Sequence, residues 1–445
     1  MRRIWVSLVS LLLIVLLPGV VLGKTTLSWF APMSPGPEVD LWQGLIAEFE
    51  KKNPDIEIKL SFEPWNDYWT KIATMFAGGQ YPDIVWMHYT RFKDYAHQGA
   101  LLPLDDYIKK DKAFAPDLAQ IPPVLKKIFQ HKGKQYVLPK DHGGIAVWYN
   151  MDMFDQAGVK YPWQGWTWQD FLTIAQKLTK DFNGDGINDQ WGTTDIMFGG
   201  DPANWWHHEQ GWAFIKSFGG NTYSDDYKSV FIDKPETIEA IQFMADCINK
   251  YKVAPTADQI ASLGPAFRIG KAAMSCFPHA AEGYWIRYEK RPIKRYGVEF
   301  LPKGKGGTWY GLGATGFAIP SGSKYPDLAW KFIKYALSKE VSEKVAEHYR
   351  WGTQRMDMWA KRFELQIERG IPIEENWKRV WVDSVLNPSK VGVHLGYARV
   401  PAGAMEINTI LRTEFDPVYL GKKTAADAAK AAKPKILEVL KKFYK

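Results

Sequence analysis

The stretch Asp181–Asp189, DFNGDGIND, alternates oxygen-bearing side chains with small or apolar residues. Four of these side chains stand at positions 1, 3, 5 and 9 of the stretch: Asp181, Asn183, Asp185 and Asp189. With Gly186 at position 6, this is the spacing of a calcium-binding loop, in which position 7, here Ile187, supplies its backbone carbonyl. Gly192 replaces the usual glutamate at position 12, so Asp195 or a distant carboxylate would complete the cage. A turn without metal is the alternative, and we favour a structural Ca²⁺ ion.

Aromatic residues suggest a second chemistry, the binding of sugars. The 445-residue chain has 21 tryptophans, 21 tyrosines and 23 phenylalanines. Flat aromatic faces stack on the apolar C–H faces of sugar rings, while neighbouring polar groups bond to the hydroxyls. A tryptophan-rich core accounts for most of these residues, and we expect the others in a carbohydrate site.

Carboxylates near the aromatic residues allow a third chemistry, hydrolysis of a glycosidic bond by two facing acids. Five carboxylates could supply such a pair: Asp67, Asp83, Asp141, Glu209 and Glu282. The order of the predicted elements, however, matches neither an eightfold barrel nor a hydrolase sandwich. The run His207-His208-Glu209 could suggest a metal site, but it lacks HExxH spacing and adjacent residues on a helix point apart, so it argues against a metal. A binding protein is therefore favoured over an enzyme.

The length and the N-terminus indicate how the chain is organised. A chain of 445 residues exceeds the size at which one core usually stops growing, so two lobes are expected. Residues 1–23 read as a signal peptide, because Arg2-Arg3 precede the apolar run Ile4–Leu17 and Val21-Leu22-Gly23 offer a cleavage site. We expect export to the periplasm or cell surface, with the leader cleaved or, as the alternative, kept as an anchor.

Charge and cysteine content exclude other classes. The net charge of +8 falls to +6 without the two leader arginines, and the basic residues gather on helical faces such as Lys422–Lys445. This is a solvated face and not a nucleic-acid-binding stripe, so no nucleic-acid partner is expected. Cys247 and Cys276 could form one disulfide or remain buried thiols, because each stands in an apolar context.

Strands and helices alternate after the leader, which predicts an α/β unit. The expected elements are strand Thr26–Phe30, helix Val39–Lys52, strand Ile56–Phe62, a helix entered through the loop Glu63–Tyr68, and strand Ile84–Met87. Ligands of such units bind beyond the carboxyl ends of the strands. We therefore expect the polar residues after the last strand, His88, Tyr89 and Arg91, to line a binding cleft; an ordinary surface loop is the alternative.

Several stretches resemble, in the same order, segments of the maltose-binding-like family 1 extracellular solute-binding proteins, the periplasmic sugar-binding components of ABC importers. These stretches are Tyr81–Leu104 (YPDIVWMHYTRFKDYAHQGALLPL), Gln135–Asn150, Asp181–Asp189, Trp205–Gly220, Phe267–Phe277, Trp309–Ala314 and Arg350–Arg355. The resemblance covers nearly the whole mature chain. It implies an α/β, two-lobed periplasmic-binding-protein fold (type II-like), in which each lobe is a sheet flanked by helices.

The resemblance also implies where the chain changes lobes. The N-lobe would comprise residues 24–139 and 311–352, and the C-lobe residues 143–308 and 353–445. Three hinge crossings are expected, near 140–142, 309–310 and 352–353. In Gln135–Asn150 we expect an irregular segment from Pro139 to Gly143-Gly144, because glycines adopt backbone angles that other residues rarely adopt. Closure of the lobes would bury the solute.

The candidate solute-binding residues come from the loops that the resemblance places at the cleft. The residues expected to stack on sugar rings are Trp65, Trp206, Trp285 and Trp309. The residues expected to bond to hydroxyls are Asp67, His88, Arg91, Asp141 and Glu209. The other candidates are Phe30, Tyr89, His142, His207, Phe277, His279, Gly311 and Arg355. Pro278-His279 follow Phe277 where the family often has a glycine and a tryptophan, a departure from its pattern.

These features predict a solute-binding protein that captures a carbohydrate, an oligosaccharide in our interpretation, and delivers it to the membrane permease subunits of an ABC importer. We expect a monomer without catalytic residues or an organic cofactor. The alternatives are a secreted glycoside hydrolase, or the same fold binding a glycerophosphodiester or other polar solute. A phosphate calls for several basic residues, and the cleft segments offer Arg91, Lys140 and Arg355.

Overall fold

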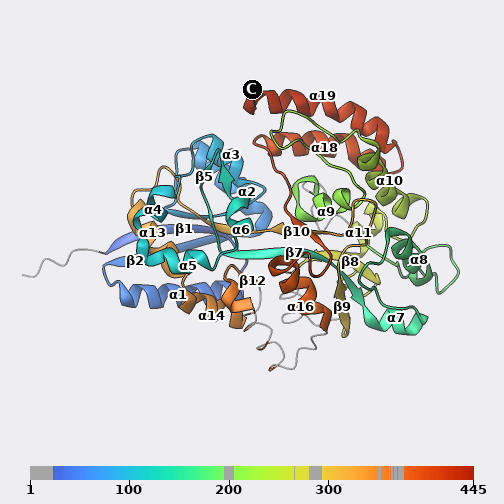
Figure 1. The fold of residues 1–445 in the computed structure, drawn as a ribbon, viewed down its shortest axis with the longest axis horizontal. Coiled ribbons are helices and arrows are strands. Elements are labelled where there is room, and N and C mark those ends of the chain that lie inside the picture. The colour runs from blue at the N-terminus through green and yellow to red at the C-terminus, as the bar shows by residue number, and fades with distance from the viewer. Residues whose placement is uncertain are drawn as a thin grey trace, which may run out of the picture.

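The computed structural model describes residues 24–194, 205–264, 266–279, 293–348, 352–359 and 375–444, with positions 361, 364 and 368. The predicted signal peptide and Trp285 lie outside the described residues. Within these ranges, no helix has the length and apolar character needed to cross a membrane. Figure 1 shows two bodies side by side, joined by long strands that run between them.

The first sheet has five strands in the order β2-β1-β3-β11-β6. Their bounds are β1 Thr25–Pro32, β2 Ile56–Glu63, β3 Ile84–His88, β6 Leu138–Pro139 and β11 Thr315–Ala318. The strands β2 and β3 run parallel to β1, while β11 runs antiparallel to both β3 and β6. We call this sheet and the helices packed on it the first lobe.

Helices α1 (Pro37–Lys52) and α2 (Trp65–Ala77) connect the three parallel strands, so the predicted β-α-β-α-β start is present. Strand β2 alternates buried Ile56 and Ile58 with exposed Glu57 and Lys59, as a half-covered strand does. Strand β3 is buried throughout, which explains its continuous apolar run. Helix α2 begins at Trp65, three residues before Tyr68, where the expected loop ends, so Trp65 and Asp67 lie in its first turn.

The second sheet is built around β7 (Asp141–Asn150), in the order β12-β7-β10-β13. Its other strands are β8 Met274–Pro278, β9 Tyr296–Glu299, β10 Trp309–Gly313, β12 Gly352–Thr353 and β13 His394–Gly396. Strands β8 and β9 also pair with β7. We call this sheet with its helices the second lobe. The two lobes give the predicted α/β architecture of two sheets flanked by helices.

The remaining elements flank the two sheets (Figure 1). On the first lobe and its margins they are α3 Phe92–His97, α4 Asp105–Lys110, η1 Lys112–Phe114, α5 Ala115–Ala119, α6 Pro123–Ile128, β4 Gln130–His131, β5 Lys134–Gln135, α13 Pro326–Ala336 and α14 Lys339–His348. The others are α7 Met151–Ala157, α8 Trp168–Leu178, η2 Trp205–His207, α9 Glu209–Ser217, α10 Pro235–Asn249, α11 Ala257–Leu263, η3 Met356–Met358, α16 Glu375–Lys378, η4 Arg379–Asp383, α17 Ser384–Leu386, α18 Ala404–Tyr419 and α19 Ala425–Phe443.

Within the residues that the structure describes, the chain changes sheets at three places. It passes from β6 to β7 through Lys140 and returns from β10 to β11 through Ala314. It crosses again between α14, whose Val341 lies in the core of the first lobe, and β12, which pairs with β7. Strand β10 pairs with β7 and β13, so the second change of sheet falls at Ala314 rather than at 309–310. That these crossings act as hinges stays a prediction.

The irregular patch expected before Gly143-Gly144 is wrong, because Asp141–Asn150 form one continuous strand. Neither glycine has a positive φ angle. Gly144 instead lies against the ring of Tyr310, and a Cβ atom there would lie 1.7 Å from the Tyr310 hydroxyl. The glycine is needed for this close approach and not for a turn.

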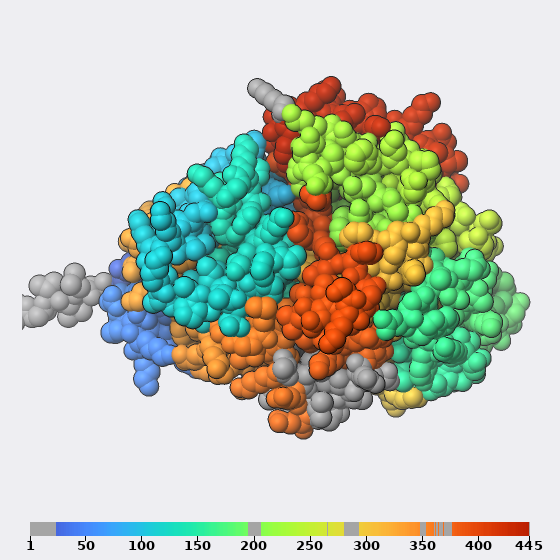
Figure 2. Space-filling view, viewed as in Figure 1, coloured from blue at the N-terminus to red at the C-terminus, as the bar shows by residue number. Residues whose placement is uncertain are grey.

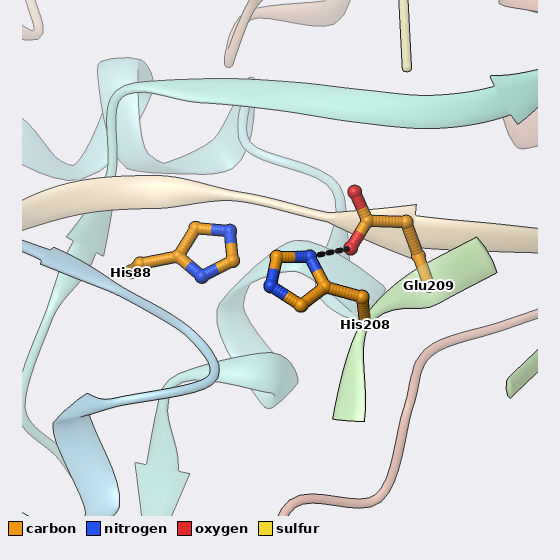
Figure 3. A group of neighbouring side chains, drawn as sticks. All are labelled: His88, His208 and Glu209. Carbon is orange, nitrogen blue, oxygen red and sulfur yellow. Dashed lines mark ion pairs between the residues drawn. The ribbon is translucent and has the colours of Figure 1, made fainter. Parts of the chain in front are cut away.

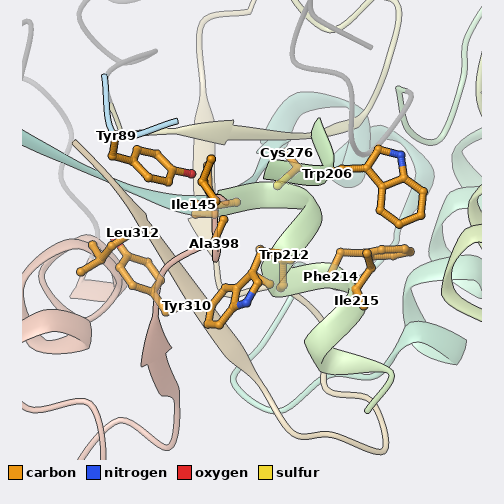
Figure 4. Close-up of a cluster of buried hydrophobic side chains, with 14 of the residues drawn as sticks. Tyr89, Ile145, Trp206, Trp212, Phe214, Ile215, Cys276, Tyr310, Leu312 and Ala398 are labelled. Atoms are coloured by element: carbon orange, nitrogen blue, oxygen red, sulfur yellow. The ribbon is translucent and has the colours of Figure 1, made fainter. Parts of the chain in front are cut away.

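Two clusters of buried side chains form the core. One fills the space between the first sheet and helices α1 and α13, where Trp29 packs edge-on against Trp42 with ring centroids 5.1 Å apart. The other covers the opposite face of that sheet and continues into the second lobe, from Tyr89 to Trp212 and Cys276 (Figure 4). Cys247 and Cys276 are both free and buried. On the face shown in Figure 2, a segment near residues 380–400, coloured orange-red, lies between the two lobes.

Candidate functional site

Polar side chains from both lobes meet where β3 of the first lobe faces the start of α9 in the second. His88 is the last residue of β3, while His208 and Glu209 begin α9. The rings of His88 and His208 are stacked, with centroids 5.3 Å apart and an interplanar angle of 29°. Nδ1 of His208 lies 3.6 Å from Oε2 of Glu209 (Figure 3). We call His88, His208 and Glu209 the inter-lobe triad.

The tyrosine next to His88 joins the lobes directly. The buried Tyr89 hydroxyl donates to Oε2 of Glu209 at 2.8 Å and lies 3.1 Å from the backbone carbonyl oxygen of His207. Burial and the neighbouring Glu209 carboxylate raise the pKa of Tyr89, so the hydroxyl keeps its proton. Tyr89 thus lies at the contact between the lobes, and a role of Tyr89 in solute binding stays a prediction.

Two glycines of β10 make room for Glu209. A Cβ atom on Gly311 would lie 2.3 Å from the backbone oxygen of Glu209, and one on Gly313 would lie 2.7 Å from its carboxyl carbon. The sequence Gly-Leu-Gly thus allows α9 to pack closely on the second sheet. Gly311 acts by this close approach rather than through a side chain.

At neutral pH Glu209 is ionised and His88 is neutral. Burial alone would raise the pKa of Glu209, but the hydrogen bond of His208 and the electrostatic influence of His208 and His88 lower it to about 2. Burial lowers the pKa of His88 to about 3. The nearby His208 and Arg91 also lower it, whereas Glu209 raises it. A carboxylate and a neutral imidazole therefore face each other in the folded protein.

Aromatic rings border the triad on the first lobe. Trp65 has 36% of its surface exposed and meets His88 edge-on at 5.2 Å. Its other edge-on neighbour is Trp69, over which the guanidinium of Arg91 lies at 5.6 Å from the ring centroid. Asp67, in the same first turn of α2 as Trp65, is exposed, whereas Phe30 is buried against Tyr68. Trp65 is thus the exposed aromatic face beside the inter-lobe triad.

A second aromatic pair lies on the second lobe. The half-buried ring of Trp309 lies 4.8 Å from that of His394, at an interplanar angle of 33°. Trp212 packs edge-on against Trp309, and Nζ of Lys216 lies 4.9 Å from its ring centroid. Sequence reasoning missed His394, although the alternation of apolar residues in Val391–Gly396 could have indicated the strand that carries it.

Two predicted cleft residues lie in the core of the second lobe instead. Trp206 is 2% exposed and packs against Phe415, so the stacking face expected of it is covered in this structure. His207 is fully buried, and its Nδ1 lies 2.6 Å from Oδ1 of Asn408. Nε2 of His207 lies 2.8 Å from the hydroxyl of Tyr223. The neighbour His208, which sequence reasoning did not select, faces His88 in their place.

Three further candidates hold the crossings together. Oδ1 of Asp141 accepts the backbone N–H of Thr315 at 2.7 Å, and its other oxygen pairs with Lys140. Nδ1 of His142 lies 3.0 Å from the carbonyl oxygen of Thr353. Arg355 pairs with Asp117 and Asp357. A role of Asp141, His142 or Arg355 in solute binding stays a prediction.

The last two candidates lie at the end of β8. Phe277 is half-buried and contacts Phe267. His279 is buried, stacks on Trp381 with ring centroids 4.5 Å apart, and its backbone N–H donates to the carbonyl oxygen of Gly144. The predicted platform beyond them, Trp285, lies outside the described residues.

The loop at 181–189 is exposed and folded around its own side-chain oxygens. Asp181 accepts the backbone N–H groups of Gly184 and Gly186 at 2.7 and 2.9 Å. Three more side-chain oxygens accept backbone N–H groups. The Asn183 side chain accepts from Asp185, the Asp185 carboxylate from Ile187, and the Asp189 carboxylate from Phe182. The hydrogen bonds from the backbone N–H groups of Gly186 and Gly184 lower the pKa of Asp181, which is therefore ionised. Each oxygen retains a second lone pair, so the set of donors fits Ca²⁺.

Two lobes with three crossings and a polar contact between them define a two-lobed binding protein. The family model of bacterial extracellular solute-binding proteins matches residues 35–343, and the chain belongs to this family. Members of this family bind solutes and are not enzymes, so the alternative of a glycoside hydrolase is set aside.

Relatives and solved structures agree with this assignment. The chain is 27% identical over 318 residues to the maltotriose-binding protein of Pyrococcus abyssi, covering 69% of this chain and 62% of that protein. It is 25% identical over 330 residues to the arabinooligosaccharide-binding protein of Bacillus subtilis, covering 72% and 71%. An ABC substrate-binding protein from Listeria monocytogenes in complex with cycloalternan superposes with a TM-score of 0.78 at 25% identity, covering 94% and 99%. The match thus spans less than two thirds of the maltotriose-binding protein.

Proposed function

We propose that this protein captures an oligosaccharide between its two lobes at the periplasmic or outer cell surface and delivers it to the membrane subunits of an ABC importer. The observation that supports this is the meeting of His88 and Tyr89 with His208 and Glu209 beside the exposed ring of Trp65. Relatives named for binding maltotriose and arabinooligosaccharides add support for the class of solute.

The contact between Tyr89 and Glu209 explains how a sugar stabilises the closed form. A sugar hydroxyl donates one hydrogen bond and accepts others. It therefore bonds to the Glu209 carboxylate of one lobe and the Tyr89 hydroxyl of the other at the same time. The closed form, which alone presents both groups, is the state that the importer recognises.

The charges near the crossings favour a neutral solute over a phosphodiester. Lys140 is buried and paired with Asp141 at 2.6 Å. Arg355 is buried and paired with Asp117 and Asp357. Of the three basic residues considered for a phosphate, these two have their charge offset by carboxylates. A sugar, which needs no countercharge, fits this arrangement better.

The 181–189 loop would hold a structural Ca²⁺ ion through Asp181, Asn183, Asp185 and Asp189 with the carbonyl of Ile187. The ion would fix the irregular connection after α8, which ends at Leu178. It would bind apart from the sugar.

A thermal-shift screen of the mature protein against neutral oligosaccharides tests the proposal, because a ligand of the folded state raises the melting temperature. The sugar that gives the largest rise is then titrated into the wild type and into Tyr89→Phe by calorimetry. Loss of a hydrogen bond to a charged group is expected to weaken binding by about 1.5–3 kcal/mol.

Tyr107→Phe is the matched control, because the Tyr107 hydroxyl donates to Asp327 on the exposed surface of the first lobe. It should bind the sugar as the wild type does. Cleavage of the sugar during incubation, or equal affinities for Tyr89→Phe and the wild type, would contradict the proposed site.

A further inference from the structure

We infer that the inter-lobe triad binds a divalent transition-metal ion of the zinc class, and that the ion ties the two lobes together. One ligand atom from each of His88, His208 and Glu209 lies within 4.8 Å of the other two. Across the described parts of the chain, this is the only such group of three histidine, cysteine, aspartate or glutamate residues. In Figure 3 the His208 ring lies between the His88 ring and the Glu209 carboxylate.

The type of ligand selects the type of metal. Two imidazoles and one carboxylate are ligands that Zn²⁺ accepts in a tetrahedral site, and three protein ligands leave a fourth position open. The hard cations Ca²⁺ and Mg²⁺ instead require cages made of oxygen atoms. Nitrogen donors from His88 and His208 therefore favour zinc or a neighbouring transition metal.

One of the three distances between ligand atoms is close to that of a bound zinc ion, while the three atoms as a set lie within 4.8 Å of one another and would have to draw together. Ligand atoms about 2.0–2.2 Å from a tetrahedral zinc ion lie about 3.3 Å from one another. Nδ1 of His208 and Oε2 of Glu209 are 3.6 Å apart. Rotation of two side chains by a few tenths of an ångström brings this pair to the geometry of a bound ion.

Outer hydrogen bonds orient two of the three ligands. Nδ1 of His88 lies 2.7 Å from Oγ1 of Thr90, and donation to that oxygen leaves the lone pair on Nε2 for a metal. The Tyr89 hydroxyl donates to Oε2 of Glu209 at 2.8 Å and fixes the carboxylate.

The position of the triad makes the ion a link between the lobes. His88 ends β3 of the first sheet, whereas His208 and Glu209 begin α9, which packs on β10 of the second sheet. An ion bound to all three side chains holds the lobes closed without a sugar. The metal therefore acts on the same closure that the proposed sugar uses, and it shares His88 and Glu209 with the proposed sugar site.

The test uses the full mature protein after treatment with EDTA and dialysis. Calorimetric titration with ZnCl₂ is expected to show one saturable site, and small-angle scattering to show a smaller radius of gyration with zinc than without it. Co²⁺ is expected to give the visible absorption of a tetrahedral nitrogen–oxygen site. No saturable uptake of zinc would overturn the inference.

Variants locate the ion. His208→Ala is expected to weaken zinc binding by at least about 100-fold, with circular dichroism used to show that it folds. His97→Ala, which removes a half-buried histidine of α3 outside the triad, should bind zinc as the wild type does. Zinc binding that survives in His208→Ala but is lost in Asp185→Ala would place the ion on the 181–189 loop and overturn the inference. Sugar binding is measured separately in EDTA, so a failure of zinc uptake is distinguished from a failure of sugar binding, although the two sites share His88 and Glu209.

Discussion

Asp141 and Thr315 are joined by a 2.7 Å hydrogen bond from the Thr315 backbone N–H to Oδ1 of Asp141, which links the first residue of β7 to the first residue of β11. Each residue directly follows a change of sheet, at Lys140 and at Ala314. The second oxygen of Asp141 pairs with Lys140 at 2.6 Å, and Nζ of Lys140 lies 4.0 Å from the ring centroid of Trp86. Two crossings are thus bound to each other by one buried carboxylate.

Asp141→Ala should therefore destabilise the protein strongly. It leaves the Thr315 N–H without its acceptor and the buried Lys140 ammonium without this carboxylate, so the free energy of unfolding is expected to fall by about 3–5 kcal/mol. Urea unfolding measures the change. Asp155→Ala is the control, because Asp155 pairs with Arg295 on the exposed surface, and its unfolding midpoint should stay close to that of the wild type. Equal midpoints for the two variants would contradict a structural role for Asp141.

Gly311→Ala should weaken solute binding by displacing Glu209. The added Cβ atom would lie 2.3 Å from the Glu209 backbone oxygen, so α9 has to shift. This shift moves the Glu209 carboxylate away from the Tyr89 hydroxyl. Affinity for the sugar, measured by calorimetry, is expected to drop by at least about 1.5 kcal/mol. Gly44→Ala, in the middle of α1 with open space around it, should keep this affinity and add about 0.5–1 kcal/mol of stability. Unchanged sugar binding in Gly311→Ala would show that Glu209 takes no part in the site.

Acid should destabilise the protein through His207. Burial and the nearby His208, Arg91 and Lys93 lower the pKa of His207 to about 3, although the hydrogen bond to Oδ1 of Asn408 raises it. Below pH 6.5 the unfolded chain binds a proton at this histidine that the folded protein does not. Stability is then complete above pH 6.5 and falls toward pH 3, by at most about 1.4 kcal/mol per pH unit for this group.

Urea unfolding at intervals between pH 7 and pH 4 measures that slope. Burial also lowers the pKa of His88 to about 3, so the wild-type slope contains contributions from both histidines. In His207→Asn, the unfolding free energy is expected to depend less steeply on pH over this range, because the contribution of His207 is removed. A variant with the same slope as the wild type would show that His207 takes up its proton in the folded state.

Chelation should lower the melting temperature if the 181–189 loop holds calcium. Ca²⁺ at 100 times its dissociation constant adds about 2.7 kcal/mol to the stability of the folded state. Ca²⁺ is expected to restore the melting temperature better than Mg²⁺, because Mg²⁺ requires a tight octahedron. Asp185→Ala should abolish the calcium effect and leave sugar binding intact. No change of melting on chelation, with no calcium found by elemental analysis, would contradict the metal.

Much of the fold could be predicted because its elements carry strong local patterns. The alternation in Ile56–Lys59 and the continuous apolar run of Ile84–Met87 identified a half-covered and a fully covered strand. Gly143-Gly144 gave the wrong signal, because a pair of glycines indicates a turn unless the partner that approaches them is known. That partner is Tyr310, far away in the sequence.

The site was harder to predict than the fold. His88 and Glu209 were selected and are close together, but His208 was passed over for Trp206 and His207. These residues are adjacent, and the change from the short helix η2 to α9 decides which of them faces the other lobe. Composition and spacing do not record that change of helical geometry, so the three-dimensional structure was needed to choose among neighbours.

The antiparallel pairing of β3 with β11 also governs how the chain folds. His88 pairs with Thr315, so the central strand of the first sheet lacks one neighbour until nearly three quarters of the chain is available. Contacts between residues so distant in sequence close slowly, because the intervening chain loses conformational entropy before the contact forms. Refolding should therefore be slow for a protein of this size. A fragment that ends before Thr315 retains its early helices but lacks the strand that completes their sheet.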